Sequence, residues 1–184
     1  MKPAPWIFIS LLLCSLFLSN SCRKQKNEEQ LPPATQTGAN TFGCLVDGKV
    51  WIPTGGGAGS GVNPTRGGFF QDAAGKLNIH IAANSYNDYI EIYLKYITST
   101  GTFYLNSNTG VKPNVIFPES YGAYFIRNTS DYFVTDTLHT GLVKITYADT
   151  TTGIVSGTFE FTAKNKQTGE IKEITKGRFD YKTH

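Results

Sequence analysis

The sequence has 184 residues, a formal net charge of +3 and 40% hydrophobic residues. That length suits one domain with its own core rather than two. The basic residues are scattered along the chain rather than gathered in a patch, which argues against a nucleic-acid-binding surface. The sequence carries no phosphate-loop, zinc-site or hydrolase signature. The lack of these motifs favours a protein that is not an enzyme.

The first 21 residues are typical of an export signal. Lys2 precedes an apolar run from Trp6 to Leu18, which has the length of a signal-peptide core and is short for a membrane-spanning helix. Small polar residues then lead to Cys22, and this pattern resembles a bacterial lipobox. We expect residues 1–21 to be removed and Cys22 to carry acyl chains such as palmitate. An ordinary secretory signal is the alternative, and it would leave the protein exported but soluble.

Residues 22–40 are poor in apolar side chains and contain the pair Pro32-Pro33. Such a segment cannot bury enough surface to offset its ordering entropy, so the composition predicts a flexible tether. Arg23 follows the lipidation site, where an acidic residue would resemble an inner-membrane retention signal. We therefore expect an outer-membrane lipoprotein, with its periplasmic or surface side left open.

The folded domain is predicted to span residues 41–184. Its first two strands, Phe42–Val46 and Lys49–Ile52, flank Asp47-Gly48, which is a strong hairpin signal. With Cys22 lipidated, Cys44 has no disulfide partner in the chain and is expected to be a buried, small hydrophobic residue.

Residues 54–68 form a glycine-rich stretch that is predicted to be a surface loop. Its glycines fit neither phosphate-binding spacing, and a strand-like pattern follows where a phosphate loop needs a helix. A role as a binding loop stays open.

The rest of the domain alternates apolar and polar residues with a period of two. Residues 111–120 contain Pro113 and Pro118 and are predicted to be an edge segment or loop. The predicted strands are Phe69–Ala73, Lys76–Ala83, Tyr89–Ile97, Thr102–Leu105, Tyr121–Arg127, Tyr132–Thr137, Leu142–Tyr147, Ile154–Asn165 and Glu170–Lys182. About ten strands and no helical stripe predict an all-β fold, an antiparallel β-sandwich or, alternatively, a closed up-and-down barrel.

Two stretches carry a resemblance. Residues 42–53 (FGCLVDGKVWIP) and residues 157–180, which include GTFEFTAKN and ITKGRFD, resemble a family of small uncharacterised lipoproteins of the Bacteroidota. The similarity spans most of residues 41–181. It implies a β fold and a location in the cell envelope, and it brings no catalytic residues.

Three tyrosines are the candidate ligand-binding residues. Tyr89 and Tyr93 share one face of a predicted strand, and Tyr86 lies just before it. Exposed aromatic rings on a sheet can stack on sugar rings; the alternative is that these residues form ordinary cross-strand pairs.

Catalytic and metal sites find little support in the sequence. His80 and His139 are the candidate catalytic histidines, and Asp131, Asp136 and His139 could be written as a metal site. These residues lack any recognised ligand spacing, so we predict no catalytic residue, no metal and no cofactor.

The sequence therefore predicts a non-catalytic, lipid-anchored binding or adaptor module of the cell envelope. Its expected partners are the membrane, through the lipid on Cys22, and a glycan or an envelope protein. The first alternative is a structural subunit of an envelope complex, and the second is an enzyme of unrecognised type.

Overall fold

The computed structural model describes residues 30–56, 61, 63–97, 99–107 and 119–183, which form eleven antiparallel strands and no helix. The predicted signal peptide, Cys22 and most of the proline-containing segment 111–120 lie outside the described residues. No helix among those residues has the length and apolarity needed to cross a membrane. The strands are β1 (Thr41–Val46), β2 (Lys49–Trp51), β3 (Thr65–Gln71), β4 (Leu77–Asn84), β5 (Asp88–Leu94), β6 (Gly101–Leu105), β7 (Tyr121–Ile126), β8 (Asp131–Val134), β9 (Gly141–Asp149), β10 (Ile154–Asn165) and β11 (Ile171–Lys182).

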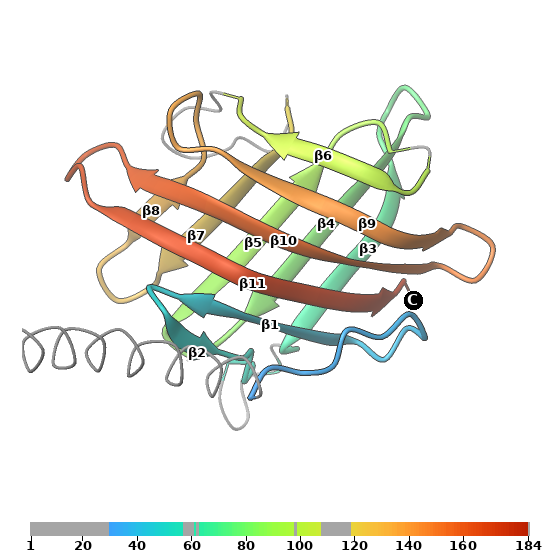
Figure 1. Ribbon diagram of the computed structural model, residues 1–184, viewed down its shortest axis with the longest axis horizontal. Coiled ribbons are helices and arrows are strands. Elements are labelled where there is room, and N and C mark those ends of the chain that lie inside the picture. Colours follow the sequence, from blue (N-terminus) through green and yellow to red (C-terminus); the bar gives the residue numbers. More distant parts are fainter. Residues whose placement is uncertain (1–29, 57–60, 62, 98, 108–118, 184) are drawn as a thin grey trace, which may run out of the picture.

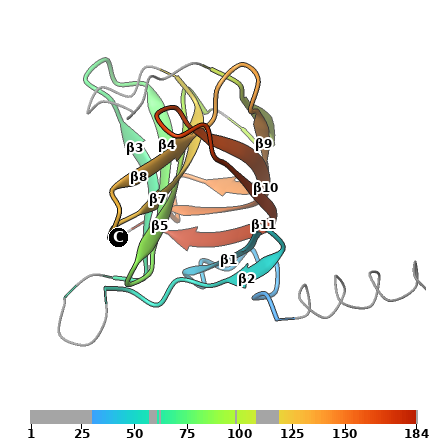
Figure 2. The ribbon, with the colours of Figure 1, turned by 90° about the vertical axis from the view of Figure 1, so that its left-hand side faces the viewer.

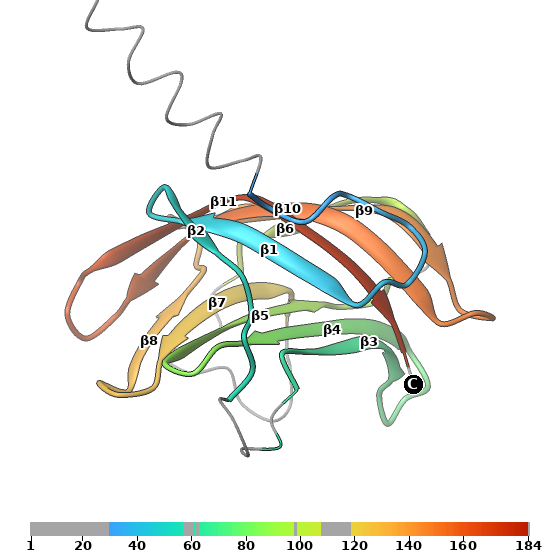
Figure 3. The same cartoon turned by 90° about the horizontal axis from the view of Figure 1, so that it is seen from below.

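All eleven strands belong to one strongly curled sheet (Figure 1). Its order is β2-β1-β11-β10-β8-β7-β5-β4-β3, and β9 pairs with β10 and carries β6 at its other edge. Figure 3 shows the result as two layers, with β1, β11, β10 and β9 facing β8, β7, β5, β4 and β3. We call these the first and second layers. The predicted all-β antiparallel sandwich is confirmed, in the form of an open curled sheet.

The long strand β10 joins the two layers at a corner. Its residues 154–161 pair with β9 in the first layer, whereas Lys164 and Asn165 pair with β8 in the second. Figure 2 shows the two layers on either side of this corner. One strand thus supplies backbone partners to both layers, a connection that residue patterns alone do not reveal.

The main core fills the space between the layers. Ile79, Ile81 and Ile92 of the second layer are fully buried against Phe159 and Phe179 of the first. These residues alternate with outward-facing ones, as the period of two predicted. Each layer therefore presents one face to this core and a second face outward.

Cys44 is buried in this core, as predicted. Burial, with the nearby Asp88 carboxylate second, raises the pKa of its thiol. The thiol therefore stays protonated, and a protonated thiol is a poor nucleophile.

The hairpin predicted at Asp47-Gly48 is present. Both residues have positive φ, at 50° and 73°, and Val46 pairs with Lys49 across the turn. This conformation matches the twist of the flanking strands, and glycine adopts it without steric cost.

Several predicted strand boundaries differ from the structure, and two of these errors concern the glycine-rich loop and Tyr96. β3 begins at Thr65, inside the predicted loop 54–68, because residues 65–71 pair in unbroken register with β4. β5 ends at Leu94 rather than at Ile97, because Tyr96 takes a positive φ of 57°. Tyr96 is consequently half exposed and does not share the inward face of Leu94.

The predicted flexible tether is also wrong for its second half. Residues 30–40, which we call the strap, lie against the domain beside β1 and the end of β11 (Figure 1). The strap lies close to the sheet at Gly43, where an added Cβ would sit 2.5 Å from Pro32 Cδ. Residues 22–29 lie outside the described part of the chain.

The buried carboxylate of Asp180 holds the strap. It accepts hydrogen bonds from Thr35 Oγ1 at 2.6 Å, from the backbone N–H groups of Thr37, Gly38 and Ala39, and from Ser156 Oγ at 2.7 Å. Burial alone would raise the pKa of Asp180, but these hydrogen bonds outweigh it and hold the pKa well below its usual range. This charge orders a segment whose composition predicted disorder.

Candidate functional site

The predicted ligand-binding tyrosines do not form one exposed platform. Tyr86 lies in the β4–β5 turn and is 67% exposed, Tyr89 is partly buried, and Tyr93 is only 3% exposed. Tyr89 packs on Phe125 of β7 with ring centroids 5.0 Å apart. The expectation that Tyr89 and Tyr93 are displayed together is therefore wrong, while ligand binding by Tyr86 or Tyr89 stays a prediction.

Tyr93 belongs instead to an aromatic cluster on the outer face of the second layer. Its hydroxyl donates to Asn78 Oδ1 at 3.1 Å, and its ring stacks on that of Tyr121. The members of this aromatic cluster are Tyr93, Tyr121, Ala123, Tyr132 and Val134, with Phe70, Tyr89 and Phe125 packed against them. The cluster is a second, smaller core on a face that a sandwich ordinarily leaves to solvent.

Glu91 is the polar centre of the aromatic cluster. Its Oε1 accepts a hydrogen bond from the Tyr121 hydroxyl at 2.6 Å and lies 2.9 Å from His80 Nε2. Burial alone would raise the pKa of Glu91, but the hydrogen bonds from His80 and Tyr121 lower it. Burial and the Glu91 charge together raise the pKa of Tyr121. The phenol therefore stays protonated and donates its hydrogen bond to the Glu91 carboxylate.

The second candidate histidine lies in a turn. His139 Nδ1 is 3.0 Å from Asp136 Oδ1, which also accepts from the backbone N–H groups of Leu138 and His139. Asp131, the third residue considered for a metal site, instead accepts from Asn165 Nδ2 at 2.9 Å. Among the described residues no group of three or more histidine, cysteine or acidic side chains could hold a metal ion.

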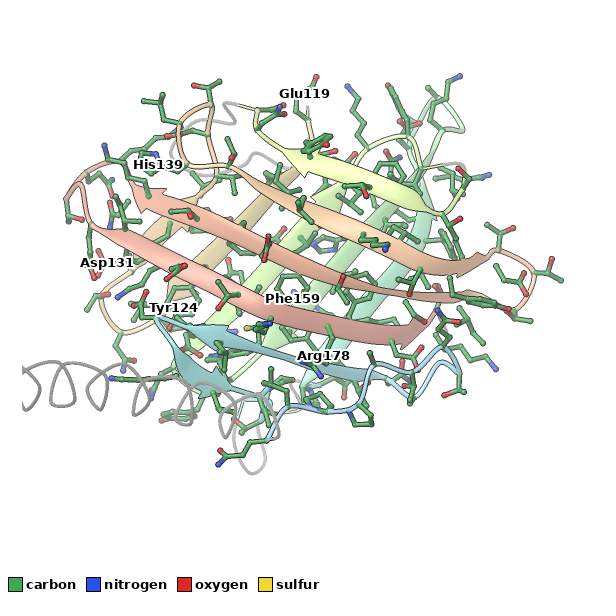
Figure 4. The ribbon with its side chains drawn as sticks, in the orientation of Figure 1. Glu119, Tyr124, Asp131, His139, Phe159 and Arg178 are labelled. Atoms are coloured by element: carbon green, nitrogen blue, oxygen red, sulfur yellow. The ribbon has the colours of Figure 1, made fainter. Side chains whose placement is uncertain are left out.

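A groove lies on the outer face of the first layer, across β6, β9, β10 and β11, the strands at the front of Figure 4. It consists of two hollows of about 360 and 500 Å³, which share Leu142 and Glu160. We call it the outer groove; its lining includes Thr102, Tyr104, Thr140, Leu142, Lys144, Thr158, Glu160, Thr162, Glu173, Thr175, Lys176 and Arg178.

The strand register arranges these side chains in rows across the groove. One row runs from Tyr104 through Leu142 to Glu160. The next runs from Thr102 through Lys144 and Thr158 to Arg178. Because neighbouring strands lie about 4.8 Å apart, residues of one row are close enough to contact the same ligand.

Tyr104 is the most exposed aromatic residue of the outer groove. Its neighbours Phe103 and Leu105 face the core, so the alternation within β6 directs Thr102 and Tyr104 outward. The Tyr104 side chain is 64% exposed, although it lines the smaller hollow. The sequence alternation could have identified Tyr104 as outward-facing, but only the sheet order reveals the threonines and carboxylates around it.

The strap borders the larger hollow of the groove. Ala34 lines this hollow, and Arg178 Nη1 donates to the backbone oxygen of Pro32 at 3.4 Å. The strap therefore helps to position Arg178, which Figure 4 labels on the strap side of β11.

The outer groove offers an exposed ring, threonine hydroxyls, two carboxylates and three cationic side chains. Groups of these kinds can bind hydroxylated ligands by stacking and hydrogen bonding. The model of a family described as a domain of unknown function (DUF6252) matches residues 68–181. The chain belongs to this family. No curated protein and no solved structure matches it.

The match to DUF6252 covers most of β3 and all of the strands from β4 to β10, and it ends within β11. All lining residues of the outer groove except Ala34 fall inside it. The groove is thus built by the DUF6252 region, while the strap, β1 and β2 precede that region.

Proposed function

We propose that this chain is a non-catalytic, lipid-anchored glycan-binding module of the bacterial cell envelope, with the outer groove as its binding site. The observation that carries the proposal is Tyr104, an exposed residue set in a groove whose lining includes threonine hydroxyls and charged groups. An exposed ring on a rigid strand can stack on the apolar face of a sugar. The surrounding threonines and glutamates can hydrogen-bond its hydroxyls.

The groove is suited to binding rather than to chemistry. Its walls are strands except at Ala34 of the strap and at Thr140, so backbone pairing holds most of the lining side chains. Its lining contains no histidine or cysteine, and we assign its two carboxylates, Glu160 and Glu173, to accepting hydrogen bonds from sugar hydroxyls. Glu160 and Thr158 sit on the central strand β10, where a ligand lying across the strands would contact them.

The anchor part of the proposal rests on the sequence of residues 1–22. We propose that the protein is an outer-membrane lipoprotein of the Bacteroidota type, acylated on Cys22. Metabolic labelling with palmitate should mark the wild-type chain, and Cys22→Ser should lose both the label and the membrane fraction. A labelled Cys22→Ser variant would place the anchor elsewhere.

Glycan binding is tested by comparing two equally exposed tyrosines. Tyr104→Ala should abolish retardation of the protein in gels that contain an immobilised polysaccharide. Tyr86→Ala, which removes a ring that is 67% exposed outside the groove, should leave retardation unchanged. If Tyr86→Ala abolished retardation and Tyr104→Ala did not, the site would lie at Tyr86, one of the tyrosines that the sequence predicted. If the wild-type protein and both variants all ran without retardation, glycan binding would be excluded.

A further inference from the structure

We propose that the glycan taken by the outer groove is acidic, with its anionic group at the end lined by Lys144, Lys176 and Arg178. A neutral sugar unit then lies over Tyr104 at the other end. This inference rests on the proposed function, since it names the class of ligand for the same groove.

The larger hollow is cationic. Three basic side chains line it, and Glu160 is its single carboxylate. Lys144 and Arg178 face outward in one row, on either side of Thr158. Within the described residues Lys144 forms no ion pair. An anion in this hollow would therefore form a charge-assisted hydrogen bond with Lys144, for which the described part of the protein supplies no ion-pair partner.

The smaller hollow has the opposite character. Its lining contains Glu160 and Glu173 but no lysine or arginine. Its remaining polar side chains are the hydroxyls of Tyr104 and three threonines. Carboxylates repel an anionic group and accept hydrogen bonds from sugar hydroxyls, so this end favours an uncharged unit. The charge of the lining therefore differs between the two ends of the groove. This difference selects both the composition of the glycan and the direction in which it binds.

The spacing of the strands sets the length of the ligand. Tyr104 lies on β6 and Arg178 on β11, with β9 and β10 between them. Three inter-strand steps of about 4.8 Å separate these two residues by about 14 Å across the strands. A ligand that contacts both Tyr104 and Arg178 is therefore an oligosaccharide rather than a single sugar.

The experiment uses probes that differ only in charge. The full chain, solubilised in detergent, is titrated by calorimetry with oligogalacturonate and with its methyl ester, and in parallel with hyaluronate oligosaccharides and their methyl ester. At least one acid form should bind about tenfold or more tightly than its ester, a difference of about 1.4 kcal/mol. That binding should weaken as salt is raised.

Lys144→Glu should remove the preference for the acid form, and Tyr104→Ala should weaken both forms. Lys76→Glu is the matched control, because it reverses an exposed charge in the β3–β4 turn of the other layer. Equal binding of acid and ester would overturn the acidic ligand and leave glycan binding standing. Acid binding that survives Lys144→Glu would place the anion outside this groove and overturn the inference. Binding of no probe would overturn the inference and count against glycan binding itself.

Discussion

The two layers of this sandwich use their outer faces in opposite ways. On the second layer, tyrosine and phenylalanine rings close over Glu91 and leave its side chain 14% exposed. On the first layer, short threonine side chains leave an open groove beside Tyr104, whose ring is 64% exposed. The same strand geometry thus gives a second core on one face and, on the other, an open groove that we propose as a binding surface. The size of the side chains that lie beside one another on paired strands decides whether a face closes into a core or stays open as a groove.

The largest effect is expected where the second layer is closed. Tyr121 is fully buried, stacks on Tyr93 and donates to Glu91. Tyr121→Ala should lower the free energy of unfolding by about 3–5 kcal/mol, because it opens a cavity and removes a hydrogen bond from a buried carboxylate. Urea denaturation measures this. Tyr121→Phe, which keeps the ring, should cost about 1–2 kcal/mol; similar small losses for both variants would contradict a packed role for the cluster.

The next effect concerns the strap on the first layer. Asp180→Asn keeps the side-chain shape but removes the charge that accepts hydrogen bonds from Thr35, Ser156 and the strap backbone. We expect a loss of about 2–4 kcal/mol in urea denaturation and faster proteolysis within residues 30–40. Glu160→Gln, an exposed carboxylate on the same outer face, is the control and should change stability by less than about 0.5 kcal/mol. Equal protease resistance in wild type and Asp180→Asn would show that Asp180 does not hold the strap.

Acid should weaken the same contact in the wild type. The pKa of Asp180 is lowered in the folded state, while an unfolded aspartate titrates near about 3.9. Its contribution to stability is therefore fully present above about pH 4 and is lost as the pH falls toward the lower folded-state pKa. Unfolding free energies measured from pH 6 to pH 2 should fall less steeply for Asp180→Asn than for wild type. Parallel curves would contradict an ionised Asp180.

The smallest effect on stability is expected in the outer groove. Tyr104→Ala removes a ring that is mostly exposed, so the free energy of unfolding should change by less than about 0.5 kcal/mol. Comparing the loss in unfolding free energy with that of Tyr121→Ala is informative, because both variants replace a tyrosine by alanine and differ in the outer face that carries the tyrosine. A loss above about 2 kcal/mol for Tyr104→Ala would make Tyr104 a structural residue and weaken the proposed function.

The alternation of apolar and polar residues determined much of the fold from the sequence alone. β10 was predicted with the bounds that the structure shows, and the hairpin at Asp47-Gly48 was predicted from its dipeptide. The buried state of Cys44 followed from its place in an apolar strand. These predictions succeed because strand alternation and tight turns are local, and local sequence controls them.

The candidate site was not within reach of the sequence. Tyr93 and Tyr104 both occupy outward positions on strands, yet Tyr93 is buried and Tyr104 is exposed. The difference lies in residues distant in the chain: Tyr121 and Phe70 beside Tyr93, and Leu142 and Glu160 in the row of Tyr104. Which strands become neighbours is a property of the whole sheet.

Neighbouring residues control some features of this protein, and residues far apart in the chain control the others. The sequence by itself determined an all-β chain with turns at defined places and predicted an export signal over residues 1–21, just before Cys22, because these features depend on neighbouring residues. The tertiary structure decided that β10 joins two layers, that Asp180 orders the strap and that threonines line a groove around Tyr104. Those outcomes depend on pairing between residues far apart in the chain, and local composition carries no record of that pairing.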